Sequence, residues 1–341
     1  MPHERRGSEY SLPISTYERL LTEVREAGCF RRTYTQYICV TLITVLGLTV
    51  SAYGIVSTDT LWIQILNACL AGFLCVQLGL IGHDLSHAGV FQSKTLNRSV
   101  ARIVWGLGCG LSESRWFRKH NAHHQSPNHI GYDPDLKIPF AFSEAQALQY
   151  STFYQRYIFP RQHTLFWIGL GFVYPYNILH SMRFLLKDSS AQSVFEVILM
   201  SIHFVLVLGF TFFFLPPMTA VLFNLVVFLV VGLYMGMIFA PNHKGEDMLA
   251  PEGIHNWVHQ ITLTRNITPS FLVSYILGGL EYQIEHHLFL GMSRFQYPRA
   301  QAIVKEFCAK EHIPYTETSW TGSLKCIHTA LRDVARMYIV R

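Results

Sequence analysis

The sequence is poor in charge, and this scarcity narrows the class of protein. Only 14% of the 341 residues are charged, whereas about 25% is usual for a soluble domain, and 50% are hydrophobic. No glycine-rich nucleotide fingerprint, internal repeat or low-complexity tract occurs, and the net charge is only +5. These absences argue against nucleic acid as a partner and favour an integral membrane protein.

Cysteine pairs with redox or metal-binding spacing are also lacking. The seven cysteines form no Cys-x-x-Cys motif, so we expect reduced thiols rather than a disulfide framework. The N-terminal region has no apolar run of the kind found in signal peptides, so we expect no cleavable signal. It instead predicts a short amphipathic helix, with Ser15 or Thr16 as its N-cap and Leu20, Leu21 and Val24 on one side.

Long apolar runs, by contrast, are abundant. Four are long enough to cross a hydrocarbon core of about 30 Å, for which roughly 20 helical residues suffice. They lie at approximately 35–56, 61–82, 194–215 and 219–240, and only short links separate the members of each pair. We therefore expect an all-α membrane protein whose four transmembrane helices form two hairpins. A fifth run, at 164–186, is interrupted by Pro175 and predicts an interfacial or re-entrant helix.

The distribution of positive charge predicts the orientation of these helices. All 27 lysines and arginines fall outside the four long apolar runs and their two short links, with 6 in residues 1–34, 11 in 83–193 and 10 in 241–341. Such an excess marks the cytoplasmic side of a membrane, so we expect both termini and the central segment there. The predicted organisation is a cytosolic segment at 1–34, a membrane domain at 35–310 and a cytosolic segment at 311–341.

Histidine is unusually frequent, and most of the 17 histidines fall into tight groups. Spacings of three and four residues within two groups place the rings on one face of a helix. The groups adjoin predicted helix ends on one side of the membrane, and they contain His83 and His87; His120, His123 and His124; His243; and His286 and His287. Eight imidazoles exceed the four positions of a zinc site, and imidazole is also a good iron ligand. We therefore expect a site with two metal ions.

Three of these groups resemble the histidine boxes of the membrane-bound fatty acid desaturases, a superfamily that also contains hydroxylases, ketolases and acetylenases. The matching segments are GHDLSHAG, RKHNAHHQ and EYQIEHH, and the glutamine of the last is similar to the branch of front-end acyl-lipid and bacterial acyl desaturases. The resemblance covers roughly residues 30–310. The chain departs from that branch at Leu290 and Ser293, where prolines are expected, and it has no His-Pro-Gly-Gly motif of a fused cytochrome b5.

The resemblance implies a four-helix membrane fold with a cytosolic helical cap, in which the eight grouped histidines ligate a non-haem di-iron centre with O2 as co-substrate. The implied activity is that of an oxidoreductase that desaturates an acyl chain linked to a lipid, to CoA or to a carrier protein. A separate electron donor of the ferredoxin or cytochrome b5 type, with its reductase, is expected. The position of the double bond and the oligomeric state stay open.

Two alternatives to a desaturase remain. A hydroxylase or an acetylenase of the same superfamily would share the ligands, and a non-catalytic metal-handling membrane protein belongs to a different class. A transporter of that class is expected to place paired charges within the membrane, whereas the four apolar runs contain Glu196 as their single charged residue. This difference favours the enzyme.

Polar and aromatic residues near the boxes are candidates for supporting roles. A group that bonds to the far ring nitrogen of a ligand histidine orients that histidine, and supporting or water-mediated roles are predicted for Gln283, Asp84, Asn242 and Glu285, with Asp133 and Asp135 as further carboxylates. Candidates for an acyl tunnel or a headgroup contact are Trp105, Arg115, Trp116 and Trp257. A contribution to the site stays open for His180, His255 and His259.

Overall fold

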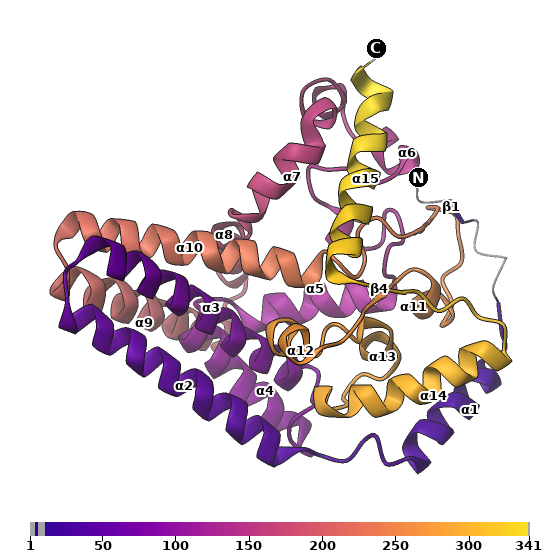
Figure 1. Ribbon diagram of the computed structural model, residues 1–341, viewed down its shortest axis with the longest axis horizontal. Helices are drawn as coiled ribbons and strands as arrows, with labels where there is room; N and C mark the ends of the chain where they lie inside the picture. Colours follow the sequence, from indigo (N-terminus) through magenta and orange to yellow (C-terminus); the bar gives the residue numbers. More distant parts are fainter. Residues whose placement is uncertain (1–3, 6–10, 340–341) are drawn as a thin grey trace. The chain divides into compact units, whose positions relative to one another are not determined.

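The computed structural model describes residues 4–5 and 11–339, and the chain divides into two compact units. The first, here called the membrane unit, consists of residues 32–118 and 169–237; the second, here called the globular unit, consists of residues 1–31, 119–168 and 238–341. Helices predominate in both units (Figure 1).

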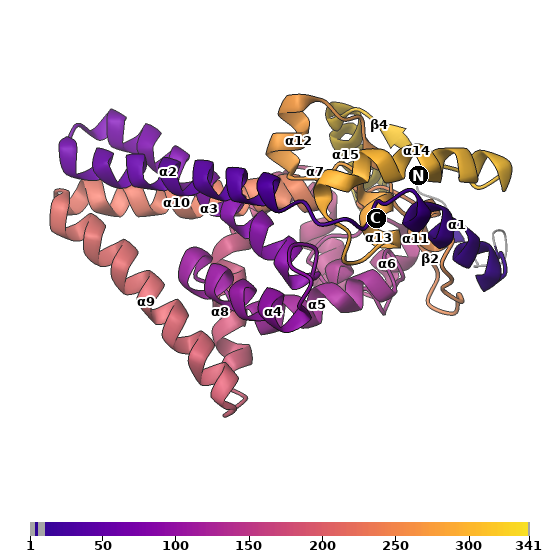
Figure 2. The same ribbon diagram turned by 90° about the horizontal axis from the view of Figure 1, so that it is seen from below.

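The membrane unit contains the four helices that the sequence predicted to span a bilayer. Their bounds are α2 (Tyr34–Ser57), α3 (Leu61–Ser86), α9 (Ala191–Phe214) and α10 (Pro217–Phe239). Each is long and apolar enough to cross a membrane. Figures 1 and 2 show α2 running beside α3, and α9 joined to α10 by a tight turn. The prediction of an all-α membrane protein is confirmed.

Helix α3 continues beyond the apolar run that predicted it. The expected span ended at residue 82, but the helix ends at Ser86, and His87 is its C-cap. The hydroxyl of Ser86 donates to the carbonyl oxygen of Gly82 at 2.9 Å and accepts from the indole nitrogen of Trp105 at 3.2 Å. His83 therefore stands on the last turn of a spanning helix.

Shorter helices complete the membrane unit, with bounds α4 (Lys94–Ile103), the π-helical turn η1 (Val104–Gly108) and α8 (Val173–Leu185). Glu196 of α9 is fully buried, and it accepts from the hydroxyl of Ser112 at 2.7 Å and from the backbone N–H of Ser114 at 3.2 Å. A carboxylate is thus fixed at the N-terminus of α5 (Glu113–Gln125), where the helix dipole favours negative charge.

The run at 164–186 forms two helices, and its break does not fall at Pro175 as predicted. Helix α7 (Gln162–Leu170) ends before Gly171, and α8 begins at Val173. Pro175 lies in the first turn of α8, where the missing N–H of proline has no helical partner to lose.

The globular unit combines many short elements with two longer helices, α14 (Tyr297–Lys310) and α15 (Trp320–Ile339). Its shorter helical elements are α1 (Ile14–Glu26), η2 (Pro134–Leu136), α6 (Glu144–Leu148), η3 (Tyr154–Ile158), η4 (Phe159–Arg161), α11 (His259–Thr262), α12 (Phe271–Leu277), α13 (Gln283–Leu288) and η5 (Arg294–Gln296). Its strands form two parallel pairs. Strand β1 (Glu4–Arg5) pairs with β2 (Met248–Leu249), and β3 (Asn266–Ile267) pairs with β4 (Glu317–Thr318).

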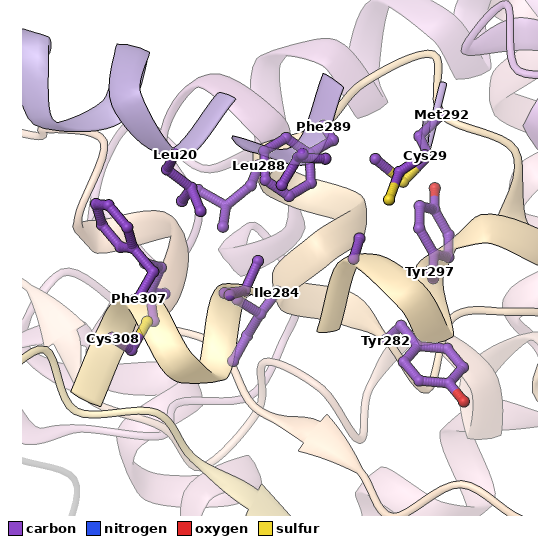
Figure 3. Close-up of a cluster of buried hydrophobic side chains, with 14 of the residues drawn as sticks. Leu20, Cys29, Tyr282, Ile284, Leu288, Phe289, Met292, Tyr297, Phe307 and Cys308 are labelled. Atoms are coloured by element: carbon purple, nitrogen blue, oxygen red, sulfur yellow. The ribbon is translucent and has the colours of Figure 1, made fainter. Parts of the chain in front are cut away.

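A buried apolar cluster packs α13 together with α1 and α14. It includes Leu20, Val24, Ile284, Leu288 and Phe307 (Figure 3). Full burial of one such side chain stabilises by about 1.5–3 kcal/mol. The hydroxyl of Tyr17 on α1 also donates to the carbonyl oxygen of Leu288 at 2.7 Å. The N-terminal helix thereby supports the segment that carries His286 and His287.

Helix α1 begins two or three residues earlier than the sequence predicted. Its N-cap is Pro13, so Ser15 and Thr16 lie within the first turn and neither caps the helix. The amphipathic pattern itself is confirmed, because Leu20 and Val24 are buried, although Leu21 is only partly so.

Candidate metal centre

Six of the eight grouped histidines lie in the globular unit, and all six are buried. Three come from α5, one follows α10 and two come from α13, in the order His120, His123, His124, His243, His286 and His287. Segments more than 100 residues apart in the sequence thus supply neighbouring rings.

Ring nitrogens of these histidines converge in pairs. The Nε2 atoms of His123 and His243 are 3.3 Å apart, and those of His120 and His124 are 3.0 Å apart. Two nitrogens bound at right angles to one ion at about 2.1 Å are about 3.0 Å from each other. Ligand nitrogens of His123, His243 and His287 also lie within 4.8 Å of one another. The donor set and its spacing therefore fit a bound transition metal.

The two pairs adjoin through the third box. The ring centroids of His124 and His287 are 4.2 Å apart, and those of His124 and His286 are 4.6 Å apart. The rings of His120 and His286 are stacked at 6.0 Å. One continuous layer of imidazoles therefore runs through this part of the globular unit, which is more than a mononuclear site needs.

Asp133 fixes the orientation of His123. Both carboxylate oxygens lie close to Nδ1 of His123, at 3.0 and 3.1 Å, and the carboxylate accepts from the backbone N–H groups of Asn128 and Asp135 at 2.8 Å each. A carboxylate at Nδ1 keeps that nitrogen protonated and leaves Nε2 for a metal. Asp135 is 3.7 Å from the same nitrogen and forms an ion pair with Lys119.

The pKa values of two of these histidines are shifted in opposite directions. Burial lowers the pKa of His243 well below its usual range, and the nearby rings of His123 and His287 lower it further. Neutral imidazole is the form that binds metal. Burial also acts to lower the pKa of His123, but the carboxylates of Asp133 and Asp135 raise it overall.

Two supporting residues were not predicted from the sequence. The amide oxygen of Gln260 lies 2.8 Å from Nδ1 of His287, while its amide nitrogen donates to the carbonyl oxygen of His124 at 2.8 Å. The hydroxyl of Tyr297 lies 3.1 Å from Nδ1 of His286. No motif spacing connects these residues to the boxes, because only the tertiary fold brings them together.

Gln283 occupies the place of the missing first histidine of the third box. Its amide nitrogen lies 2.8 Å from Nε2 of His243, and its amide oxygen accepts from the side chain of Asn242 at 2.9 Å. Gln283 thus contacts a nitrogen of the histidine cluster, a position that suits the supporting or water-mediated role predicted for it.

Glu285 makes a different set of contacts. Its carboxylate accepts from the amide of Asn266 at 2.7 Å and from the hydroxyl of Tyr315 at 2.9 Å. Burial raises the pKa of Glu285 to about 7. These bonds attach α13 to β3 and to the segment before β4.

A pocket of about 520 Å³ in the globular unit reaches two of the histidines. Its lining includes His124, His255, Trp257, Gln260 and His287. Trp257, a predicted tunnel or headgroup residue, is therefore on the wall of a pocket that touches the histidine cluster. His259 instead accepts from the backbone N–H of Asn256 at 3.0 Å.

In the membrane unit, His83 and His87 form a pair at the end of α3. Their ring centroids are 4.8 Å apart. Asp84 lies 3.1 Å from Nδ1 of His83 and accepts from the hydroxyl of Tyr37 at 2.7 Å. Asp84 thus supports His83 in the way that Asp133 supports His123.

Two tryptophans line one side of this pair. Trp105 stacks on Trp116 at 5.1 Å, and the ring of Trp116 meets His83 at 5.4 Å and His87 at 5.9 Å. Both tryptophans were predicted to line an acyl tunnel, and they form an aromatic wall beside the first box.

The two remaining candidates make other contacts within the membrane unit. The guanidinium of Arg115 donates to the amide oxygen of Asn177 at 2.9 Å, and the ring of His180 packs on Tyr176 at 4.1 Å.

Replacing Asp133 with asparagine is expected to weaken metal binding about 10- to 100-fold, the usual cost of losing the support of a ligand histidine. The amide keeps the shape of the side chain but removes the charge that holds Nδ1 of His123 protonated. Metal content after dialysis against graded chelator concentrations measures the effect, with Asp333→Asn on α15 as the matched control. An unchanged chelator profile for Asp133→Asn would contradict the supporting role.

Comparisons with known proteins complete the description of the site. A family model described as fatty acid desaturase matches residues 60–319, a range that contains every grouped histidine. A Delta(8)-fatty-acid desaturase of Borago officinalis is 28% identical and aligns with 95% of this chain and 77% of its own length. A Delta(8)-fatty-acid desaturase of Euglena gracilis is 30% identical over 80% of this chain and 67% of its own. An acyl-lipid (9-3)-desaturase of Borago officinalis is 28% identical, over 94% and 74% respectively.

Proposed function

Because this chain belongs to the fatty acid desaturase family and is an oxidoreductase that acts on fatty acyl chains, we propose that its eight grouped histidines hold two iron ions for O2-dependent desaturation. The two short Nε2 pairs, His120–His124 and His123–His243, carry the proposal. In this proposal His83 and His87 complete the ligand set.

The chain's own residues prepare the donors. Iron held by these histidines would supply the activation of O2 needed to remove two hydrogens from adjacent methylenes. Asp133, Gln260 and Tyr297 hold the far nitrogens of three ligand histidines, which turns the opposite nitrogens toward the site. Burial of the cluster keeps bulk water away from the reacting chain.

The family points to an acyl lipid as the substrate, and four apolar helices place the protein in a membrane. We propose further that the histidine boxes and both termini face the cytoplasm, because all lysines and arginines lie in those segments. A separate donor of the ferredoxin or cytochrome b5 type, with its reductase, supplies electrons there.

Acyl-chain profiling of a host that expresses this chain tests the proposed function. The control is a His286→Ala, His287→Ala double variant made to an equal level. A new unsaturated acyl species with the wild type alone is the expected result, and the mass spectrum of its derivative locates the double bond. The purified wild type is expected to hold iron.

Other outcomes would change the proposal in defined ways. A hydroxylated or alkynyl product would keep the metal centre and replace the reaction. A purified wild type that binds no iron under conditions in which the host supplies it would refute the di-iron proposal.

A further inference from the structure

An exposed aromatic and basic surface lies on the globular unit around η3. It consists of Leu148, Phe153, Arg156, Tyr157 and Arg161, here called the η3 patch, and all five side chains are exposed. Phe153 is 58% exposed and Tyr157 is 52% exposed, so both rings present apolar area at the surface. Aromatic residues and arginine are the residue types enriched where proteins bind other proteins.

A row of aromatic rings leads from the η3 patch into the unit. Tyr157 contacts Phe153 with ring centroids 5.4 Å apart, Phe153 contacts Tyr154 at 5.7 Å, and Tyr154 contacts Tyr150 at 5.3 Å. The row ends against the fully buried ring of Phe159, which lies 5.5 Å from Tyr150. Packed rings therefore connect the surface with the interior without a gap.

The inner end of this row reaches the residue that supports His123. Tyr150 and Tyr154 line a cavity of about 440 Å³ together with Asp133. The hydroxyl of Tyr150 donates to the carbonyl oxygen of Leu136 at 3.2 Å, and the N–H of Leu136 donates to the carbonyl oxygen of Asp133 at 3.2 Å. Asp133 in turn lies 3.0 Å from Nδ1 of His123. Short contacts thus extend from the η3 patch to a ligand histidine.

The surroundings of the η3 patch are basic. Helix α15 packs on the same small core, where Val334 and Tyr338 meet Tyr150 and Phe159. The η3 patch carries Arg156 and Arg161 and no carboxylate, and the adjoining helix α15 bears Arg332 and Arg336 against Asp333. A positive field of this kind speeds association with an acidic partner and makes binding sensitive to salt.

We propose that the η3 patch docks an acidic one-electron carrier protein, whose electrons reach the metal centre through Tyr154, Tyr150 and Asp133. This inference rests on the proposed function, because desaturation needs electrons from outside. O2 takes up four electrons and four protons to become two waters. The two C–H bonds that break as the C=C bond forms supply two of each, two carriers oxidised by one electron each supply the other electrons, and solvent supplies the other protons.

The aromatic rings serve as a tunnelling medium in this scheme, and they are neither oxidised nor reduced as intermediates. A lipid surface would also accept exposed rings and arginines. Lipid contact would not, however, account for the ring row that continues inward to Asp133. The carrier protein is therefore the occupant that the contacts favour.

Binding can be measured without iron. The probe is the soluble haem-binding domain of a cytochrome b5, titrated against the full chain in lipid nanodiscs at increasing salt. An Arg156→Glu, Arg161→Glu variant is expected to bind at least about tenfold more weakly at low salt. Like charges that meet across an interface cost several kcal/mol, and a tenfold loss of affinity corresponds to about 1.4 kcal/mol. Its affinity should also depend less on salt. An Arg299→Glu, Lys310→Glu variant on α14 is the matched control and should bind like the wild type.

Electron transfer is measured separately, with the haem domain reduced beforehand and present at saturation. Tyr154→Leu is expected to slow the oxidation of the haem at least about tenfold while binding is unchanged, whereas Tyr154→Phe, which keeps the ring, should retain the wild-type rate. Single turnover after anaerobic reduction of the metal centre with dithionite bypasses the η3 patch and should be equal in all three proteins.

The outcomes separate this inference from the proposed function. A wild type that forms no product even after dithionite reduction would refute the proposed function. Product formation after dithionite, together with normal binding of the haem domain by the charge-reversed variant, would refute the docking site. In that case, reduced binding of the same variant to vesicles of anionic lipid would assign the η3 patch to the membrane surface instead.

Discussion

A His243→Ala variant is expected to form product more than about 100-fold more slowly than the wild type, because losing even a support of a ligand histidine costs 10- to 100-fold. His243 lies outside the three boxes, yet its Nε2 is 3.3 Å from that of His123 and 2.8 Å from the amide nitrogen of Gln283. The variant should also hold less iron. Product analysis and metal analysis of the purified protein measure the two effects.

The matched control for this variant is His312→Asn. His312 is exposed and has a φ of 55°, a left-handed conformation that asparagine accepts more readily than alanine. The control should retain both activity and iron. Full activity in His243→Ala would mean that His243 only shapes the end of α10 and is no ligand.

An Arg265→Met variant is expected to lose about 3–5 kcal/mol of folding free energy in the globular unit, the usual cost of removing one partner of a buried ion pair. Arg265 is 1% exposed. Its guanidinium lies 2.6 Å from Glu246 and donates to the carbonyl oxygen of Pro241 at 2.7 Å and to the hydroxyl of Ser323 at 3.0 Å. These contacts hold the loop that carries His243.

Thermal unfolding in detergent, followed with a thiol-reactive dye, measures this loss, because Cys29 and Cys308 are buried in the core of the same unit. Adding Glu246→Gln to Arg265→Met should restore part of the stability, since it removes the negative charge that Arg265 contacts in the wild type. A single variant that melts at the wild-type temperature would contradict the structural role of Arg265.

The periodic and compositional features of the sequence predicted the fold well. Hydropathy located the four spanning helices because the bilayer sets their length, and the spacing of His120, His123 and His124 predicted one helix face. The same reasoning placed the end of α3 at residue 82, four residues too early, because hydropathy detects only the part of a helix that prefers lipid. The helix itself continues through polar residues to Ser86.

The supports of the histidines were only partly predictable. Asp84 directly follows His83, and Asp133 is a carboxylate ten residues after His123; their acidic side chains close to a histidine box were enough to suggest them. Gln260 and Tyr297 come from segments without a repeating pattern, 27 and 11 residues from the histidines that they contact. Glu285 was predicted from adjacency as well, but the backbone turns its carboxylate toward Asn266 and Tyr315.

The uninterrupted course of α3 from Leu61 to Ser86 makes its membrane-embedded part and the turn that bears His83 a single rigid rod. Each helical residue advances the chain by about 1.5 Å and rotates it by about 100°. One extra residue inside the rod would therefore swing the imidazole a quarter turn or more around the axis. A change in the length of α3 that suits a thicker bilayer is therefore tolerated only at its Leu61 end. There the short link to α2 can absorb the added residues without rotating His83.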